Sequence, residues 1–165
     1  MTPSGPVVRF ASTGDNDALY AILMRLSRDN PDPAALGLDH EKIKKFITAA
    51  CKRDGCVAGV IDGPSGLVAS VGLFPFLPWY AADWVISVHW LYVDSECRGG
   101  GKMADALFRF SVDHSRELSR ASGVPLGLEI SFVSRTRIAA RTRLWSKYAN
   151  QVGAMFFVAP EEVSK

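Results

Sequence analysis

Hydrophobic and polar residues follow two different periods along this chain, and each period predicts a different kind of element. Apolar residues recur every three or four positions in four segments, which predicts helices at residues 16–29, 39–53, 102–120 and 136–148. Short apolar stretches bounded by turn residues predict strands at residues 7–11, 56–62, 67–74, 84–93, 126–132 and 154–158. The predicted order is β-α-α-β-β-β-α-β-α-β. This order indicates an α/β fold (α+β in type) in which helices flank a central mixed sheet.

Turn and breaker residues mark the boundaries of these elements. Pro31 and Pro33 cannot lie inside a helix, so the first helix ends before them. Residues 63–66 (Gly-Pro-Ser-Gly) predict a hairpin turn, and residues 75–82 predict an aromatic loop. The strand at 84–93 is almost continuously apolar, so we expect it to be central and buried.

Composition is that of a globular protein. The 165 residues are 48% hydrophobic and 22% charged, which excludes intrinsic disorder and predicts a single domain over residues 1–165. The formal net charge of +2 is too small to indicate a polyanionic partner by itself.

Cysteine usage and the start of the chain predict a cytoplasmic protein. Cys51, Cys56 and Cys97 are odd in number and lack zinc-ligand spacing, so we expect reduced thiols and no metal site. The first residues lack a basic end followed by an apolar core, which predicts no export signal. No apolar run approaches the ~20 residues of a membrane helix.

The most informative segment is Arg98-Gly99-Gly100-Gly101-Lys102, between a predicted strand and a predicted helix. Glycines before a helix allow backbone N–H groups to converge on an anion, and the helix dipole favours negative charge there. A phosphate or pyrophosphate is the natural ligand. The segment is neither a Walker loop nor a complete dinucleotide fingerprint, and a plain connecting turn remains the alternative.

This segment resembles the core motif of the GNAT superfamily of N-acetyltransferases. That motif is Arg or Gln, two variable residues, Gly, one residue, and Gly or Ala, after a strand that ends in valine. Val93, the acidic turn after it, Arg98, Gly99 and Gly101 match the motif, whereas Met103 replaces the usual Gly or Ala. The element order is also that of the family. Residues 144–158 resemble the ending of short GNAT proteins from phages and bacteria.

The resemblance implies a site for acetyl-CoA as acetyl donor. Backbone N–H groups from Arg98 to Met103 would hold the pyrophosphate, and the preceding strand would pair with the pantetheine arm. The amide of Leu91 would lie near the thioester oxygen. The implied cofactor-binding residues are Leu91, Tyr92, Val93, Arg98, Gly99, Gly100, Gly101, Lys102 and Met103.

Acetylation of an amine requires a base, because an ammonium group has no lone pair. His89, nine residues before Arg98, matches the histidine base of the arylalkylamine branch of the superfamily. Ser87, on the same strand face, would hold a water beside it. A core histidine bonded to a backbone carbonyl is the alternative. Glu129 is a second candidate base or a solvated strand residue.

The departing thiolate requires an acid, which in the family is a tyrosine on the last helix. Trp145 occupies the matching position, and Tyr148 lies three residues further along. We therefore take Tyr148 as the candidate acid, with packing in the core as its alternative. Cys97 beside the glycines suggests an acetyl-cysteine route, although a small apolar packing residue is the simpler interpretation.

The sequence thus predicts an acetyl-CoA-dependent N-acetyltransferase that acts by direct attack of a primary amine. The acceptor is a small amine or a peptide, and residues 30–38 are an expected wall of its pocket. Residues 76–80 line either that pocket or a dimer contact, and a homodimer is plausible. One alternative is a GNAT fold that binds acyl-CoA without catalysis. The other is nucleic-acid binding through a basic stripe on the last helix. We rank three roles for this stripe: a solvated face first, a contact to the CoA phosphate second and nucleic-acid binding third. The stripe comprises Arg135, Arg137, Arg141, Arg143 and Lys147.

Overall fold

The computed structural model describes residues 5–30, 37–79, 82–130 and 146. Its strands are β1 (Arg9–Phe10), β2 (Val57–Gly63), β3 (Gly66–Phe76), β4 (Val85–Val93) and β5 (Gly127–Ile130). Its helices are α1 (Asn16–Asp29), α3 (His40–Lys52) and α4 (Lys102–Ser122), with short 3₁₀ turns η1 (Thr13–Asp15), η2 (Ser95–Cys97) and η3 (Gly99–Gly101).

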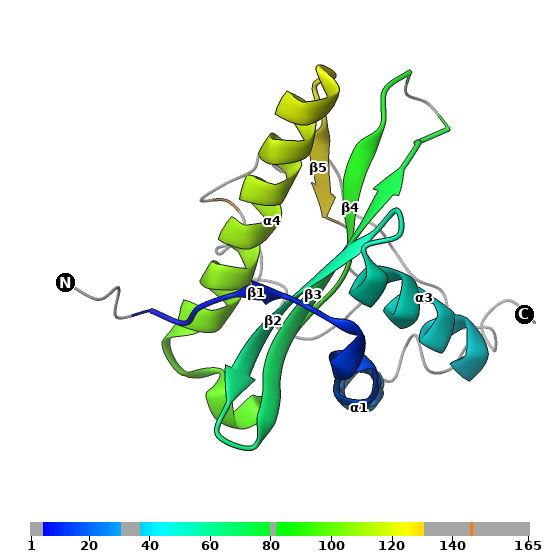
Figure 1. Ribbon diagram of the computed structural model, residues 1–165. Helices are drawn as coiled ribbons and strands as arrows, with labels where there is room; N and C mark the ends of the chain where they lie inside the picture. Colours follow the sequence, from blue (N-terminus) through cyan, green and yellow to red (C-terminus); the bar gives the residue numbers. More distant parts are fainter. Residues whose placement is uncertain (1–4, 31–36, 80–81, 131–145, 147–165) are drawn as a thin grey trace, which may run out of the picture.

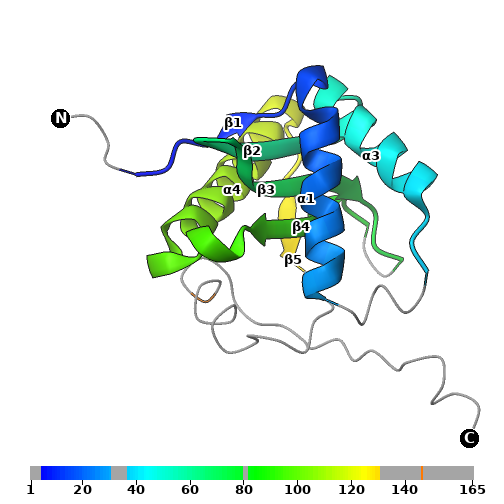
Figure 2. The same ribbon diagram turned by 90° about the horizontal axis from the view of Figure 1, so that it is seen from below.

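The strands form one mixed sheet in the order β1-β2-β3-β4-β5. Neighbouring strands are antiparallel from β1 to β4, and β4 pairs with β5 in parallel. Helices α1 and α3 cover one face of the sheet and α4 covers the other (Figure 1). Figure 2 shows α1 crossing in front of the strands with α4 behind them. The predicted fold class is therefore confirmed.

Each face of the sheet has its own apolar core, as the alternation of strand residues requires. Val71, Leu73, Ile86 and Val88 pack toward α4 together with Leu107 of that helix. The opposite core, beneath α1 and α3, contains Leu19, Ile22, Ile47, Val60 and Trp90. The sheet is thus buried on both faces, between the two cores.

A β-bulge in β4 changes this alternation. Leu73 of β3 pairs with Val88 and Gly72 pairs with Trp90, which leaves His89 as the extra residue. Ile86 and Val88 face α4 before the bulge, and Leu91 and Val93 do so after it. His89 and Trp90 both lie beside Phe74, on the α1 and α3 face. The bulge therefore adds one outward-facing position to an otherwise buried strand.

Most of the predicted boundaries agree with the structure to within two residues, but the aromatic loop begins later than predicted. Pro75 and Phe76 belong to β3, because they pair with Ile86 and Val85 and continue the hairpin. The predicted helix at 136–148 and the predicted strand at 154–158 lie outside the described residues.

Two further properties bear on the expectations from sequence. Cys51, Cys56 and Cys97 are free thiols. Within the part of the chain that the structure describes, no helix is both long enough and apolar enough to span a bilayer.

Candidate active site

The glycine segment forms a turn that only glycine adopts readily. Gly100 and Gly101 both have left-handed backbone angles, with φ of 71° and 70°. Arg98, before them, has right-handed angles, and α4 starts at Lys102. A right-handed residue leading into left-handed ones curls the backbone so that successive N–H groups point into one concavity. The left-handed backbone of this turn therefore explains why glycine occupies positions 100 and 101.

The outer side of this turn is open. A Cβ added at Gly99, Gly100 or Gly101 would meet no described atom within 4 Å. No side chain of the described residues caps the first turn of α4, so its leading N–H groups remain available as donors. α4 has 21 residues, and its dipole adds positive potential at this end. The turn has the donor set and the space that a pyrophosphate requires.

The Arg98 side chain points back into the protein rather than over the turn. Its Nε donates to the carbonyl of Val93 at 2.7 Å, and its Nη2 donates to Asp29. The guanidinium also lies 5.3 Å from the centre of the Tyr92 ring. Arg98 thus contributes its backbone to the turn, while its side chain anchors the turn to α1. Spacing in the sequence contained no signal for this anchor, because Asp29 is 69 residues away.

Met103, the departure from the family motif, lies on the sheet side of α4. Its half-buried side chain packs against the core between the sheet and α4. It also lines a hollow of about 280 Å³ with Val7, Arg9, Ile61 and Asp62. The larger side chain is accommodated in this way without covering the open side of the turn.

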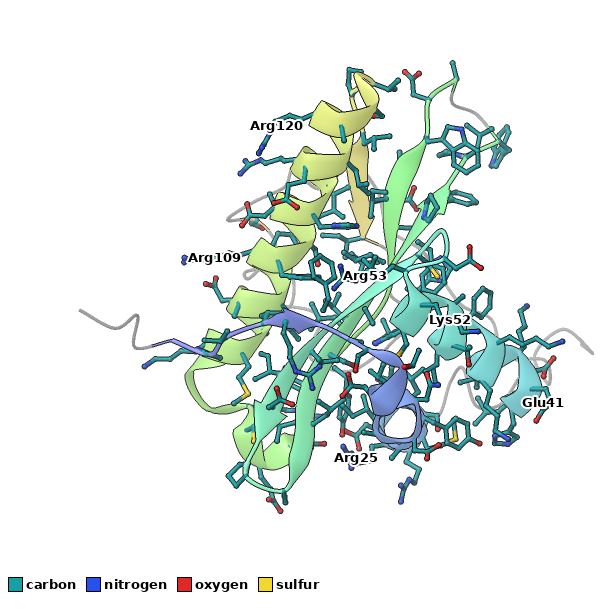
Figure 3. All side chains as sticks on the ribbon, viewed as in Figure 1. Arg25, Glu41, Lys52, Arg53, Arg109 and Arg120 are labelled. Carbon is teal, nitrogen blue, oxygen red and sulfur yellow. The ribbon has the colours of Figure 1, made fainter. Side chains whose placement is uncertain are left out.

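Two exposed cations of α4, Arg109 and Arg120, lie beyond the glycine turn, whereas Lys102 is at the turn itself. Arg109 and Arg120 project from the side of α4 opposite the sheet (Figure 3). Arg109 forms an ion pair with Asp105 at 3.0 Å.

His89 is solvent accessible at the bulge and is surrounded by aromatic rings. Its ring centroid lies 4.4 Å from that of Phe74 and 6.4 Å from that of Phe46. Desolvation by this surrounding lowers the pKa of His89 below its usual value of 6.5. The imidazole is therefore neutral at pH 7 and can accept a proton.

Polar side chains from β4 and β5 share the face of His89. Ser87 pairs with Glu129 of β5, and paired residues in a parallel sheet point to the same side. Leu128 and Ile130, on either side of Glu129, pack toward α4 instead. Ser87, His89 and Glu129 therefore occupy one face of the sheet, and Ser87 and Glu129 are neighbours across the two strands. The sequence singled out each of the three, but only the sheet register brings them together.

The other predicted donor-site residues continue β4 toward the turn. Leu91 and Val93 pack toward α4, and the buried Tyr92 donates its hydroxyl to Asp29 at 3.4 Å. Pairing with the described part of β5 covers Val85–Val88 of β4. Among the described residues, no strand pairs with the same edge of β4 from residue 89 to residue 93.

Of the remaining sequence candidates, the structure describes only Cys97. Cys97 is half-buried in η2 and packs against the core, in keeping with a small apolar role. Tyr148 and Trp145 lie outside the described residues, as does the basic stripe at 135–147.

Comparison with known proteins identifies the fold. The sequence matches no protein-family model and no curated protein. Solved structures do match: a predicted acetyltransferase with acetyl-CoA from Clostridium acetobutylicum is 15% identical, with a TM-score of 0.65, over 92% of this chain and 94% of its own. A ribosomal-protein-alanine N-acetyltransferase from Brucella melitensis is 16% identical, with a TM-score of 0.59, over 92% and 96%. An aminoglycoside acetyltransferase from an uncultured soil sample is 16% identical, with a TM-score of 0.61, over 93% and 97%.

The chain therefore has the fold of the GNAT-type acetyltransferases, as its glycine motif and element order predicted.

Proposed function

We propose that this chain is an N-acetyltransferase that transfers an acetyl group from acetyl-CoA to a primary amine by direct attack. The observation that carries the proposal is one continuous segment. In it, the accessible His89 on β4 is followed by an open, uncapped glycine turn at the start of α4. The candidate base thus lies in the middle of β4, and the candidate anion site follows the end of the same strand after one short 3₁₀ turn.

The residues present fit the acetyl donor. Backbone N–H groups of Arg98, Gly99, Gly100, Gly101, Lys102 and Met103 would bind the pyrophosphate, because the turn offers several donors and no Cβ at its centre. The edge of β4 at Leu91, Tyr92 and Val93 would pair with the amides of the pantetheine arm. Acetyl-CoA supplies a thioester carbonyl, and the Leu91 amide is the proposed donor to its oxygen.

His89 would act as the base, directly or through a water held beside Ser87. An amine with a reference pKa of ~10.4 is almost wholly protonated at pH 7, so its proton must be removed before attack. The neutral imidazole is suited to this step. Glu129, across the strand pair from Ser87, is the alternative acceptor of the proton.

Tyr148 is the proposed acid for the departing thiolate. A thiol with a reference pKa of ~8.5 also leaves without complete protonation, so the reaction does not depend entirely on this residue. A small amine or a peptide is the proposed acceptor. The similar structures named for an aminoglycoside and for a ribosomal-protein alanine span the same range of amines.

Calorimetric titration with acetyl-CoA tests the proposal, with dephospho-CoA as the matched ligand. Micromolar binding supports the glycine turn as a CoA site, and weaker binding of dephospho-CoA assigns a contact to the 3′-phosphate. Incubation with a panel of small amines and peptides, read out as free thiol, then tests turnover. Binding without turnover over a broad panel would favour a non-catalytic acyl-CoA module. Absence of binding at high protein concentration would overturn the proposal.

A further inference from the structure

Helix α1 holds both ends of the segment that joins β4 to the glycine turn. Arg25 Nε lies 2.9 Å from Asp94 Oδ1, just after β4. Asp29 accepts from Nη2 of Arg98, just before the glycines. Arg25 and Asp29 are four residues apart and therefore lie on one face of the helix. The segment is therefore held at both ends by ion pairs, with the cation on α1 at the first end and the anion on α1 at the second.

Hydrogen bonds also hold the residues between these two ion pairs. The Asp94 amide donates to Val68 O at 2.9 Å, and the Cys97 amide donates to Asp94 O at 2.9 Å. Arg98 Nε donates to Val93 O at 2.7 Å. Nη2 of Arg25 also donates to the carbonyl of Leu67, near the turn between β2 and β3, at 3.4 Å. The position of Arg98 is thus set from several directions, whereas the glycines after it have no side chains to hold them.

The placement of Asp29 is unfavourable for α1 itself. Asp29 is the last residue of the helix, where the negative end of the dipole opposes a carboxylate. Its pKa is nevertheless lowered, first of all by the hydrogen bond from Arg98. The carboxylate is therefore charged at neutral pH, and its favourable partners are Arg98 and the hydroxyl of Tyr92.

We propose that Asp29 is a positioning residue for the CoA-binding turn, which it holds in place through the Arg98 guanidinium. This inference rests on the proposed function, since it assumes that the turn binds CoA. Arg25 makes the weaker of the two contacts, because its Nε–H is not aligned with the Asp94 carboxylate. Asp29 is consequently the residue to test.

The test variant is Asp29→Asn, which retains the size of the side chain and loses its charge. We expect the Kd for acetyl-CoA to rise about three- to tenfold, as for a partly exposed charged hydrogen bond. The kcat at saturating acetyl-CoA should remain unchanged, and the midpoint of urea unfolding should fall slightly, because the lowered pKa of Asp29 means that its charged form stabilises the fold. A residue with only a structural role would lower that midpoint and leave the Kd for acetyl-CoA unchanged. Asp29→Glu should restore most of the affinity.

Two control variants test whether the effect belongs to the contact between Asp29 and Arg98. Asp17→Asn makes the same chemical change in the first turn of α1 and should leave acetyl-CoA affinity unchanged. In an Arg98→Gln background, which has no guanidinium, Asp29→Asn should have no additional effect. An unchanged Kd in Asp29→Asn, or an equal loss in both backgrounds, would overturn the positioning role while the proposed function stands. Failure of the wild-type protein to bind acetyl-CoA would overturn both.

Discussion

The imidazole of His89 packs against the ring of Phe74, with centroids 4.4 Å apart and planes inclined at 40°. The β-bulge produces this contact, because it places two successive residues, His89 and Trp90, on the same face of β4. The contact leaves the histidine accessible and lowers its pKa by desolvation. It therefore keeps a candidate base neutral at physiological pH.

Replacement of His89 should remove catalysis and leave donor binding intact. We expect His89→Gln to lower kcat about 10²- to 10⁴-fold, the usual contribution of a general base. The Kd for acetyl-CoA, measured by calorimetry, should stay at the wild-type value. Glu129→Gln is the matched comparison. A larger loss of kcat in Glu129→Gln than in His89→Gln would transfer the role of base to the glutamate.

The pH dependence should follow the His89–Phe74 contact. The neutral imidazole is the active form, so kcat/KM should be full above the pKa of His89 and fall as pH decreases through it, below 6.5. Phe74→Leu removes part of the aromatic surrounding and should move this acidic limb upward toward 6.5. The measurement is kcat/KM over pH 4.5–8 for the wild-type protein and Phe74→Leu. The same acidic limb in both would mean that a group other than His89 titrates.

The glycine turn should be sensitive to backbone strain at Gly101, which is left-handed, and not at Gly99, which is not. Gly101 has φ of 70°, whereas Gly99 does not have a positive φ, and an added Cβ meets no described atom at either. Gly101→Ala should therefore cost about 1 kcal/mol of unfolding free energy, and Gly99→Ala close to none. Urea unfolding of the two variants measures the difference. Equal losses would mean that the left-handed conformation is not required.

Gly72 should be required for a different reason, the close approach of an indole. Gly72 pairs with Trp90, and a Cβ on Gly72 would overlap the six-membered ring of that side chain. The Trp90 Nε1–H donates to the Ser70 hydroxyl at 3.0 Å, which restricts movement of the indole. Gly72→Ala should lower the free energy of unfolding by about 1–3 kcal/mol.

The control for this prediction is Gly127→Ala in β5. There, an added Cβ would lie 3.6 Å from Val85 Cγ1, an ordinary contact. Chemical unfolding should show a much smaller change for this variant. If both glycine variants unfold at the same denaturant concentration, crowding by the indole is not the cause.

Acid stability should depend on Asp15. Arg9 donates to both Asp15 oxygens, at 2.8 and 2.9 Å, and holds the pKa of that carboxyl well below its usual range. A lowered folded-state pKa stabilises the protein above the unfolded pKa near 4, and this contribution is lost as pH falls below it. Asp15→Asn should cost about 1–3 kcal/mol at pH 7 and flatten the decline between pH 5 and 2.

Unfolding in urea at pH 7, 4 and 3 measures both effects. Asp17→Asn, two residues later in the first turn of α1, is the control and should retain the acid dependence of the wild-type protein. The same dependence in Asp15→Asn would exclude the Arg9–Asp15 pair as its source.

Much of the fold was predictable from sequence, because short-range patterns specify local elements. The period of apolar residues placed α1, α3, α4 and the long strands within two residues of their observed bounds. The glycines before α4 indicated an anion site by themselves, since their freedom and the helix dipole are local properties.

Relations between distant parts of the chain required the tertiary structure. The bulge at His89 is a mismatch of one residue between two strands, and the periodicity of β4 alone does not specify where it falls. The pairing of Ser87 with Glu129, 42 residues apart, follows from a parallel register set by the crossover through α4. Asp29 and Arg98 meet only because α1 packs across the sheet.

The sequence by itself therefore determined which elements form and which segment is the candidate anion site, because both depend on neighbouring residues and a single helix end. The tertiary structure decided which polar groups share a face and which residues hold the turn. Those outcomes depend on strand register and helix packing, which many weak contacts across the whole core select together.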